Sequence, residues 1–203
     1  MRRIFITGIG TDVGKTVVSA VLTEALRADY WKPVQAGELS ETDSHKVRTL
    51  VNNRVSVFHP EAYRLSEAMS PHAAAKIDGI EIDFERINMP ETANHLIIEG
   101  AGGLMVPLSS GFLVMDLIQK FNPEVIVVIK NYLGSINHSL LALDALKRSG
   151  TPVLGVVFNG VANDESEKFI LHYSGVKCLG RIPFTENLTP DFVSSQARNF
   201  QAI

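Results

Sequence analysis

The segment TGIGTDVGKT, Thr7–Thr16, contains the residue types that a phosphate-binding loop requires. Such a loop needs small residues between a strand and a helix, because several backbone N–H groups must point at one anion. A lysine at the helix start then reaches the β- and γ-phosphates, and a Ser or Thr hydroxyl binds Mg²⁺. Lys15 and Thr16 follow glycines at positions 8, 10 and 14. The segment predicts a nucleotide site, and a tight strand-to-helix turn with an incidental lysine is the alternative.

The glycine spacing differs from the common pattern G-x-x-x-x-G-K-[ST], whose first glycine would fall at Ile9. Gly8 and Gly10 flank that position instead. The difference weakens the match to the written pattern. It does not change the expected chemistry, because backbone groups rather than particular side chains hold the phosphates.

Three charged residues could complete a site for phosphoryl transfer beside this loop. Glu99 ends the apolar run HLIIE, and ligands of open α/β sheets bind at the C-terminal edge of the strands. Glu99 is therefore a candidate metal ligand, and an ordinary strand end with a flexible turn is the alternative. Asp43, in ETDSHK, lies at a predicted helix start, where capping the helix is the alternative role. Lys32, just before Pro33, could neutralise a phosphate or a carboxylate intermediate, or it is an ordinary surface charge.

Two further segments have polar residues suited to binding. Asn159 ends the run VVFN, and its amide can match the paired donor and acceptor of an adenine edge, although Asn-Gly also favours a turn. The segment Tyr132–Leu141 begins a predicted helix whose free N–H groups could hold a carboxylate. The histidines at positions 45, 72 and 138 share no ligand spacing, so we assign them to packing or capping.

Short apolar runs rich in β-branched residues predict the strands that position these residues. Nearly continuous apolar runs suit strands that are buried on both faces, as in a parallel sheet. The predicted strands are Arg3–Thr7, His95–Glu99, Val125–Ile129 and Val153–Phe158, with Lys177–Ile182 as a weaker candidate.

Helical spacing separates these runs. The segment Lys15–Leu26 places apolar residues on one stripe, namely Val18, Val21, Leu22 and Ala25. The segment Ser135–Gly150 also has helical spacing, with Leu140, Leu141, Leu143 and Leu146 as its apolar residues. Strands that alternate with helices predict an α/β fold, a doubly wound and mostly parallel sheet with helices on both faces. The segment Phe58–Asn94 is less periodic, and we expect surface helices and loops there rather than a second domain.

The overall composition excludes several classes of protein. A chain of 203 residues with 45% hydrophobic and 20% charged residues predicts one compact domain over residues 1–203, not a disordered or fibrous chain. The net charge of −3 gives no basic footprint for nucleic acid. The single cysteine excludes an internal disulfide, and no apolar run approaches the ~20 residues of a membrane span. We therefore expect a cytoplasmic protein that binds neither nucleic acid nor membrane.

Taken together, these segments closely resemble the dethiobiotin synthetase family, ATP-dependent carboxylases that close the ureido ring in biotin synthesis. The family's phosphate loop has the same long spacing, with five residues between its first two glycines, and commonly carries Thr at the position of Ile9. The matching pieces occur in the family's order from about residue 4 to residue 184. They are GIGTDVGKT, KPVQAG, TDSHK, SPHAAA, IIEGAGGLMVPL, LGSINHSLL, VVFNG and GRIPF.

The resemblance implies a P-loop NTPase-like fold and a set of nucleotide contacts. Thr16, Asp43 and Glu99 would bind Mg²⁺, and Lys15 would act on the phosphates. The amides implied to hold the ATP phosphates are those of Asp12, Val13, Gly14, Lys15, Thr16 and Val17. Gly100, Ala101 and Gly102 would follow the cleft. The implied base contacts are Asn159, Gly160, Pro183 and Phe184.

The resemblance also implies a substrate site shared by the two subunits of a homodimer. CO₂ and one amine of 7,8-diaminopelargonate would form a carbamate, and the ATP γ-phosphate would be transferred to it. The second amine would then close the ring. Lys32 would be the catalytic lysine, beside Ala36 and Gly103. The segment implied to hold the partner's substrate carboxylate is Leu133, Gly134, Ser135, Ile136 and Asn137.

Two features depart from the family pattern. Ala36 stands where the family usually has Ser or Thr, whose hydroxyl contacts the substrate, and we expect water or Ser40 to replace that contact. After Phe184 the match is weak, and Glu186 is the candidate ATP contact there.

Two other functions remain alternatives. An amidoligase of the cobyrinate diamide synthase group would need a glutaminase domain, for which 203 residues leave no room. A partition-type ATPase switch would carry an additional lysine five residues before Lys15, where this chain has Gly10. It would also present a membrane-binding helix or a basic DNA-binding face, and neither is evident.

Overall fold

The computed structural model describes residues 1–203 and is built around one parallel sheet. The sheet has seven strands in the order β4-β2-β6-β1-β7-β8-β9, and all the neighbouring strands run parallel. A second, two-stranded sheet pairs β3 with β5. The strands are β1 Arg3–Gly8, β2 Asp29–Trp31, β3 Val34–Ala36, β4 Phe58–His59, β5 Tyr63–Leu65, β6 Leu96–Gly103, β7 Glu124–Lys130, β8 Val153–Asn159 and β9 Cys178–Ile182.

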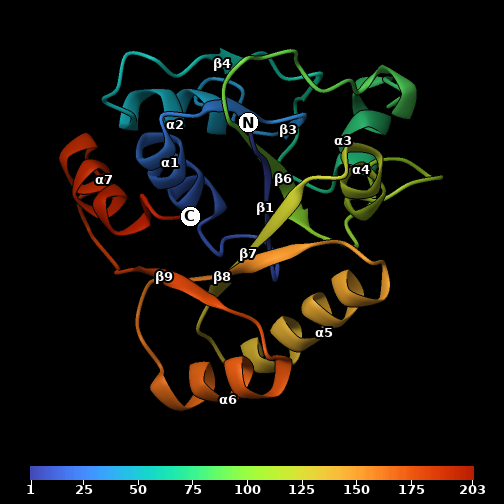
Figure 1. Ribbon diagram of the computed structural model, residues 1–203. Helices are drawn as coiled ribbons and strands as arrows, with labels where there is room; N and C mark the ends of the chain where they lie inside the picture. The colour runs from blue at the N-terminus through green and yellow to red at the C-terminus, as the bar shows by residue number, and fades with distance from the viewer.

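Helices cover both faces of the sheet, which confirms the predicted doubly wound α/β class (Figure 1). Side chains alternate between the two faces of a strand, so Ile4 and Ile6 of β1 pack on one side while Phe5 packs on the other. The first side carries α1 Lys15–Leu26, α2 Asp43–Leu50 and α7 Pro190–Ala197. The second carries α3 Pro71–Asp78, α4 Val114–Phe121, α5 Ser135–Arg148 and α6 Asp164–Ser174.

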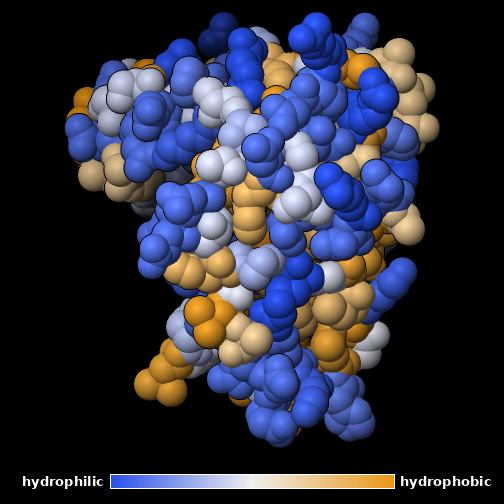
Figure 2. Space-filling model, turned by 90° about the vertical axis from the view of Figure 1, so that its left-hand side faces the viewer, coloured by the Kyte–Doolittle hydropathy of each residue, from blue (hydrophilic) through white to orange (hydrophobic).

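The C-terminal end of the chain contributes Phe200 to the core. Figure 2 shows the face at the left of Figure 1, where hydrophilic side chains predominate and hydrophobic ones form separate patches. Two short 3₁₀ turns, η1 Phe84–Arg86 and η2 Arg198–Phe200, complete the regular structure. None of the helices has both the length and the apolar character needed to cross a membrane.

Most of the predicted elements are present, and the differences have physical reasons. The five predicted strands correspond to β1, β6, β7, β8 and β9, and α1 has the predicted bounds. The segment Phe58–Asn94 was predicted to lie beside the sheet, but its first residues form β4, which pairs with β2 at the edge of the seven-stranded sheet. The predicted stripe of the later helix was wrong at Leu141, which is 60% exposed. The buried side of α5 instead follows Ser135, Ser139, Leu143 and Leu146.

The strand order reverses beside β1, and this reversal places the site. The chain leaves β1 through α1 toward β2 on one side, while β6 leads through α4 to β7 on the other side of β1. Crevices at such a switch point, outside the carboxyl ends of the strands, are where ligands of open α/β sheets bind. Glu99 lies beside Ile6 in the register of this edge, and Gly103 lies beside Gly8.

Candidate active site

The loop between β1 and α1 has a conformation that only certain residues can adopt. Gly14, directly before α1, has φ +92°, and a Cβ there would lie 2.0 Å from Nδ2 of Asn159. A side chain at this position is therefore excluded both by the backbone and by the space. Asn159 also donates a hydrogen bond from Nδ2 to the carbonyl of Val13, at 3.0 Å. The end of β8 thus supports the loop directly.

Lys15 begins α1 and turns back over the loop. Its side chain is buried, and Nζ donates to the carbonyl oxygen of Gly10 at 3.0 Å. Burial lowers the pKa of Lys15 below its usual value, an effect that the negative charge of Glu99 partly offsets. An anion bound in the loop would supply the charge that this buried ammonium lacks.

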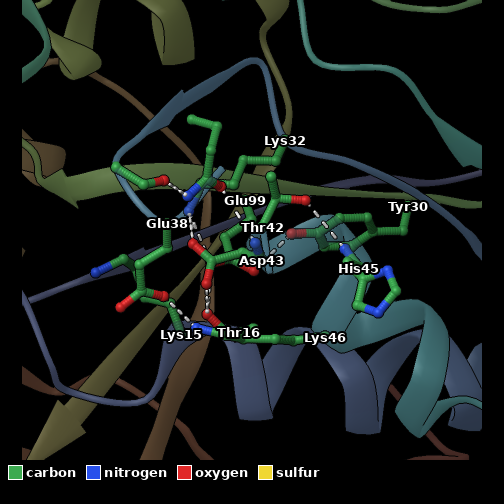
Figure 3. Close-up of polar contacts among 12 residues, drawn as sticks. Lys15, Thr16, Tyr30, Lys32, Glu38, Thr42, Asp43, His45, Lys46 and Glu99 are labelled. Carbon is green, nitrogen blue, oxygen red and sulfur yellow. Dashed lines mark hydrogen bonds and ion pairs between the residues drawn. The ribbon is translucent and has the colours of Figure 1, made fainter. Parts of the chain in front are cut away.

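Thr16, Asp43 and Glu99 meet although they come from three separate elements (Figure 3). The hydroxyl Oγ1 of Thr16 donates to Oδ1 of Asp43 at 3.1 Å and to Oε1 of Glu99 at 2.9 Å. Asp43 is the first residue of α2, and its side chain is not the helix cap, because Thr42 accepts from the N–H of His45. The sequence left capping open for Asp43, and the structure gives that role to Thr42.

Lys32 follows β2 and places its ammonium between the same two carboxylates. Nζ donates to Oδ2 of Asp43 and, at 3.3 Å, to Oε1 of Glu99. Burial alone lowers the pKa of Lys32, but the adjacent charges of Glu99 and Asp43 outweigh burial and raise it. For Asp43, burial raises the pKa and the Lys32 ammonium outweighs it, so that the net pKa is lowered. Both side chains are therefore charged at neutral pH.

A cavity of about 930 Å³ opens beside this cluster. Its wall is formed by the phosphate loop, the segment after β2, the start of α2, the end of β6 and the start of α3. The residues predicted for the site that line it are Asp12, Gly14, Lys15, Thr16, Val17, Lys32, Ala36, Asp43, Glu99, Ala101 and Gly102.

Three other predicted cleft residues lie behind the wall. Val13 is buried in the core. A Cβ on Gly100 would be 2.8 Å from the ring of Phe5, and one on Gly103 would be 3.3 Å from the carbonyl of Gly8. The glycines after Glu99 therefore allow close packing of β6 against β1.

The residues predicted to read the base or to reach a partner lie outside this cavity. They follow β7, β8 and β9 at the same edge of the sheet, and Leu133 and Phe184 are among the exposed large hydrophobic residues. They are Asn159, Gly160, Pro183 and Phe184, and Leu133, Gly134, Ser135, Ile136 and Asn137. Ser40 and Glu186 do not line the cavity, whereas Ser70 does.

Sequence reasoning missed two buried polar residues on either side of Lys32. Tyr30 donates its hydroxyl to Oε2 of Glu99 at 2.9 Å. Gln35 accepts from the N–H of Asp43 at 3.2 Å and donates to the carbonyl of Gly37 at 2.9 Å. The sequence feature that could have indicated them is their position, because Tyr30 and Gln35 lie two and three residues from Lys32.

The histidines take no part in the cluster. His45 is exposed, and His138 meets the hydroxyl of Tyr132 at 2.8 Å. No group of three or more His, Cys, Asp or Glu side chains is placed to hold a metal ion by itself. Any metal here would need ligands beyond these side chains.

The chain matches one family model and many curated relatives. The model is described as an AAA domain (AAA_26), and it matches residues 2–191. A protein of Cytophaga hutchinsonii named ATP-dependent dethiobiotin synthetase BioD is 54% identical over 198 residues, 97% of this chain and 96% of that protein. Proteins with the same name from Christiangramia forsetii and a Bradyrhizobium strain are 55% and 49% identical, over 88% and 93% of this chain and 86% and 90% of their own lengths.

Solved structures share the fold at much lower identity. A ParA family ATPase from Chlorobium tepidum has a TM-score of 0.57 and 15% identity, covering 100% of this chain and 91% of that one. The cell division ATPase MinD of Pyrococcus furiosus has a TM-score of 0.54 and 13% identity, covering 100% and 99%. These structures confirm the P-loop NTPase-like architecture. Because the relatives match over nearly their whole length, this chain belongs to the ATP-dependent dethiobiotin synthetase family.

Proposed function

We propose that this protein converts 7,8-diaminopelargonate and CO₂ to dethiobiotin and uses ATP, releasing ADP and phosphate. One observation carries the proposal beyond the family match. Two buried lysines, two carboxylates and a threonine hydroxyl converge beside a phosphate loop on one cavity. This arrangement suits phosphoryl transfer, in which the protein mainly positions groups and neutralises charge.

The loop is suited to hold the triphosphate. The backbone N–H groups of residues 12–17 lie at the start of α1, where the helix dipole favours an anion. Lys15 would exchange the carbonyl of Gly10 for phosphate oxygens, because its ammonium already lies over the loop. Asn159, Gly160, Pro183 and Phe184 would then border the base at the ends of β8 and β9.

The oxygens of Thr16, Asp43 and Glu99 fit Mg²⁺. Mg²⁺ prefers oxygen ligands, and it is usually bound by one or two carboxylates together with phosphates and water. The carboxylates of Asp43 and Glu99 already lie within hydrogen-bond distance of the Thr16 hydroxyl. Bound there, the ion would neutralise part of the charge that develops during phosphoryl transfer.

Lys32 would act where the phosphoryl group meets the substrate. CO₂ and one amine give a carbamate, and transfer of the γ-phosphoryl group gives a carbamic–phosphoric anhydride. The second amine attacks the carbonyl carbon, the C–O bond to phosphate breaks, and the ring closes. Because Nζ of Lys32 is charged and fixed by two carboxylates, it would stabilise the carbamate and the charge that develops during transfer. Ala36 and Ser70 also line the cavity, and the diamine would lie beside them.

The homodimer is the third part of the proposal. Large hydrophobic side chains are exposed on and around α5 and α6, which lie side by side in Figure 1. They are Leu133, Leu141, Val161, Phe169 and Tyr173. Contiguous exposed apolar surface is typical of interaction sites, and we assign these side chains to the interface of the homodimer. The segment 133–137 would hold the carboxylate of the substrate bound in the partner's cavity.

The test of the reaction is a balanced product assay. The protein is incubated with 7,8-diaminopelargonate, bicarbonate and MgATP, and dethiobiotin and ADP are measured together. We expect equal amounts of both, and ADP release only when the diamine is present. ADP release that does not depend on the diamine would favour an ATPase switch of the kind whose fold this chain shares. If the protein is folded and binds ATP but releases no ADP, the proposed enzymatic activity is refuted.

The test of the shared site mixes two inactive variants. Lys15→Ala removes a phosphate contact, and Asn137→Ala alters the segment proposed to reach the partner. If each site uses both chains, a mixed dimer regains one intact site, so an equal mixture recovers up to about a quarter of the unaltered activity. If the mixture stays as inactive as its components although the dimers exchange subunits, each site lies within one chain.

A further inference from the structure

The hydroxyl of Tyr30 is placed to act on the site although no part of the proposed reaction uses it. Tyr30 is the middle residue of β2, its side chain is fully buried, and its ring lies 6.1 Å from that of Phe58. The residues on either side of it in β2 are also buried. Within this packed core the hydroxyl has one partner, Oε2 of Glu99 at 2.9 Å.

The two oxygens of Glu99 have separate roles as a consequence. Oε1 accepts from Thr16 at 2.9 Å and from Lys32 at 3.3 Å, so it faces the cavity. Oε2 faces away from it and accepts from Tyr30 alone. The carboxylate is 1% exposed, so water does not replace a lost donor readily. Without the hydroxyl, Oε2 would be a buried, unpaired oxygen, and the carboxylate would lose one of the three hydrogen bonds that fix its orientation.

The hydroxyl is a permanent donor. A phenol hydroxyl has an ordinary pKa of about 10, so it carries a proton to donate at neutral pH. A neutral donor also leaves the net charge of the cluster unchanged, whereas a lysine in its place would add a third cation to Lys15 and Lys32.

We propose that Tyr30 is a positioning residue: it anchors Oε2 of Glu99 so that Oε1 stays directed at Thr16 and at the divalent ion that accompanies ATP. Tyr30 does not line the cavity proposed to hold the nucleotide and the substrate, so it would act through Glu99. The inference rests on the proposed metal site. It does not depend on which acceptor receives the phosphoryl group, so a nucleotide-binding experiment separates it from the ring-closing reaction.

The experiment compares ATP binding with and without Mg²⁺ in Tyr30→Phe. This change removes one oxygen and keeps the ring. We expect the dissociation constant of MgATP to rise about tenfold, as for a lost hydrogen bond to a charged group, and that of ATP in EDTA to change less than about twofold. The matched control is Tyr63→Phe, since the Tyr63 hydroxyl bonds the backbone of Asp83 instead of a carboxylate of the site. Neither dissociation constant should change in the control.

A double-mutant cycle shows whether Tyr30 acts through Glu99. Glu99→Gln keeps the shape of the side chain and removes its charge. In that background, Tyr30→Phe should leave the Mg²⁺-dependent part of ATP affinity unchanged. The positioning role would be overturned if Tyr30→Phe weakened ATP binding equally with Mg²⁺ and with EDTA. It would also be overturned if the effects of Tyr30→Phe and Glu99→Gln on ATP affinity were fully additive. If Mg²⁺ does not improve ATP binding by the unaltered protein, the metal site and this inference both fail, whatever the product assay shows.

Discussion

Two networks of charged side chains lie near the C-terminal edge of the same sheet. The central one joins Lys32 to Asp43 and Glu99 beside β1 and β6. The outer one joins Arg181 of β9 to Glu167 of α6. Both put a cation against a mostly buried carboxylate. The central network borders the large cavity, whereas no member of the outer network lines it.

The outer network is satisfied within the protein. Glu167 accepts from Arg181, from Nδ2 of Asn131 at 2.6 Å and from the N–H of Asn163 at 3.0 Å. Arg181 also lies over the ring of Phe158, 5.7 Å from its centroid. The network ties the segments after β7 and β8 to α6 and β9. Its charges support the backbone next to the proposed partner contact and have little capacity left for a ligand.

The contrast teaches that a buried ion pair by itself does not indicate chemistry. The central pair is distinguished by a second cation, Lys15, within the same cavity and by a threonine hydroxyl on both carboxylates. These groups converge on open space, so a ligand can change their partners. A substitution in the central network should therefore lower turnover, whereas a substitution in the outer network should lower the stability of the fold.

Lys32→Ala gives the largest expected effect and tests the central network. We expect kcat to fall about 10²–10³-fold, as for removal of a fixed charge-stabilising group, with ATP affinity nearly unchanged. Steady-state turnover and ATP titration measure the two quantities. Lys177→Ala, which removes an exposed lysine before β9, should leave both unchanged. Normal turnover of Lys32→Ala would show that the central pair is structural like the outer one.

Glu167→Gln tests the outer network. The change leaves Arg181 without its carboxylate, so the free energy of unfolding should fall by about 1–3 kcal/mol, as measured with urea. Turnover per folded molecule should stay within about twofold, because no member of the network lines the cavity. The control is Glu165→Gln, whose exposed pair with Lys168 contributes little. A large loss of kcat without loss of stability would assign a catalytic role to Glu167 and remove the contrast.

The pH dependence of stability sharpens the same comparison. Burial raises the pKa of Glu167, but Arg181 and the other donors outweigh it, so its net pKa is lowered. A carboxyl with a lowered folded pKa stabilises the fold above its unfolded pKa and loses that contribution as the pH falls through the folded value. We therefore compare the free energy of unfolding of the unaltered protein with that of Glu167→Gln. The difference between them should be constant from neutral pH down to about 5 and should become smaller at lower pH. A difference that grows on acidification would have the wrong sign for this ion pair.

The smallest effect is expected at the rim of the cavity. Lys46 pairs with Glu38, and the two side chains are 37% and 60% exposed to solvent. Lys46→Ala should change the free energy of unfolding by less than about 1 kcal/mol, and added salt should reduce the change further. Urea unfolding at low and high salt provides the measurement. A larger change that is insensitive to salt would place Lys46 with the buried networks.

The sequence predicted those parts of the site that depend on local signals. The glycines before Lys15 and the apolar run before Glu99 place both residues at the edge of the sheet, because strand ends and helix starts follow from neighbouring residues. Strands β2 to β5 were missed because each has only two or three residues, too few for a period to show. Thr42 and Asp43 are both capping residue types, so only the structure separates the helix cap from the site residue.

Tyr30 marks the limit of such reasoning. Its partner Glu99 is 69 residues away, and the contact depends on the register that places Tyr30 beside Ile97. No local pattern fixes that register, since β2 pairs with β6 through backbone groups common to all residues. The exposed Leu141 shows the same limit, because the apolar residues of a helix do not by themselves distinguish a buried face from an exposed one.

Lys32 and Pro33 lie where the chain passes from the large sheet to the small one. β2 ends at Trp31 and pairs with β4 and β6, β3 begins at Val34 and pairs with β5, and the carbonyl of Pro33 accepts from the N–H groups of Ala62 and Tyr63. The lysine backbone is therefore clamped from both directions. In the catalytic role proposed for Lys32, its ammonium would be oriented once, during folding, and not anew in each catalytic cycle. A substitution that loosens the small sheet should then slow turnover from a distance.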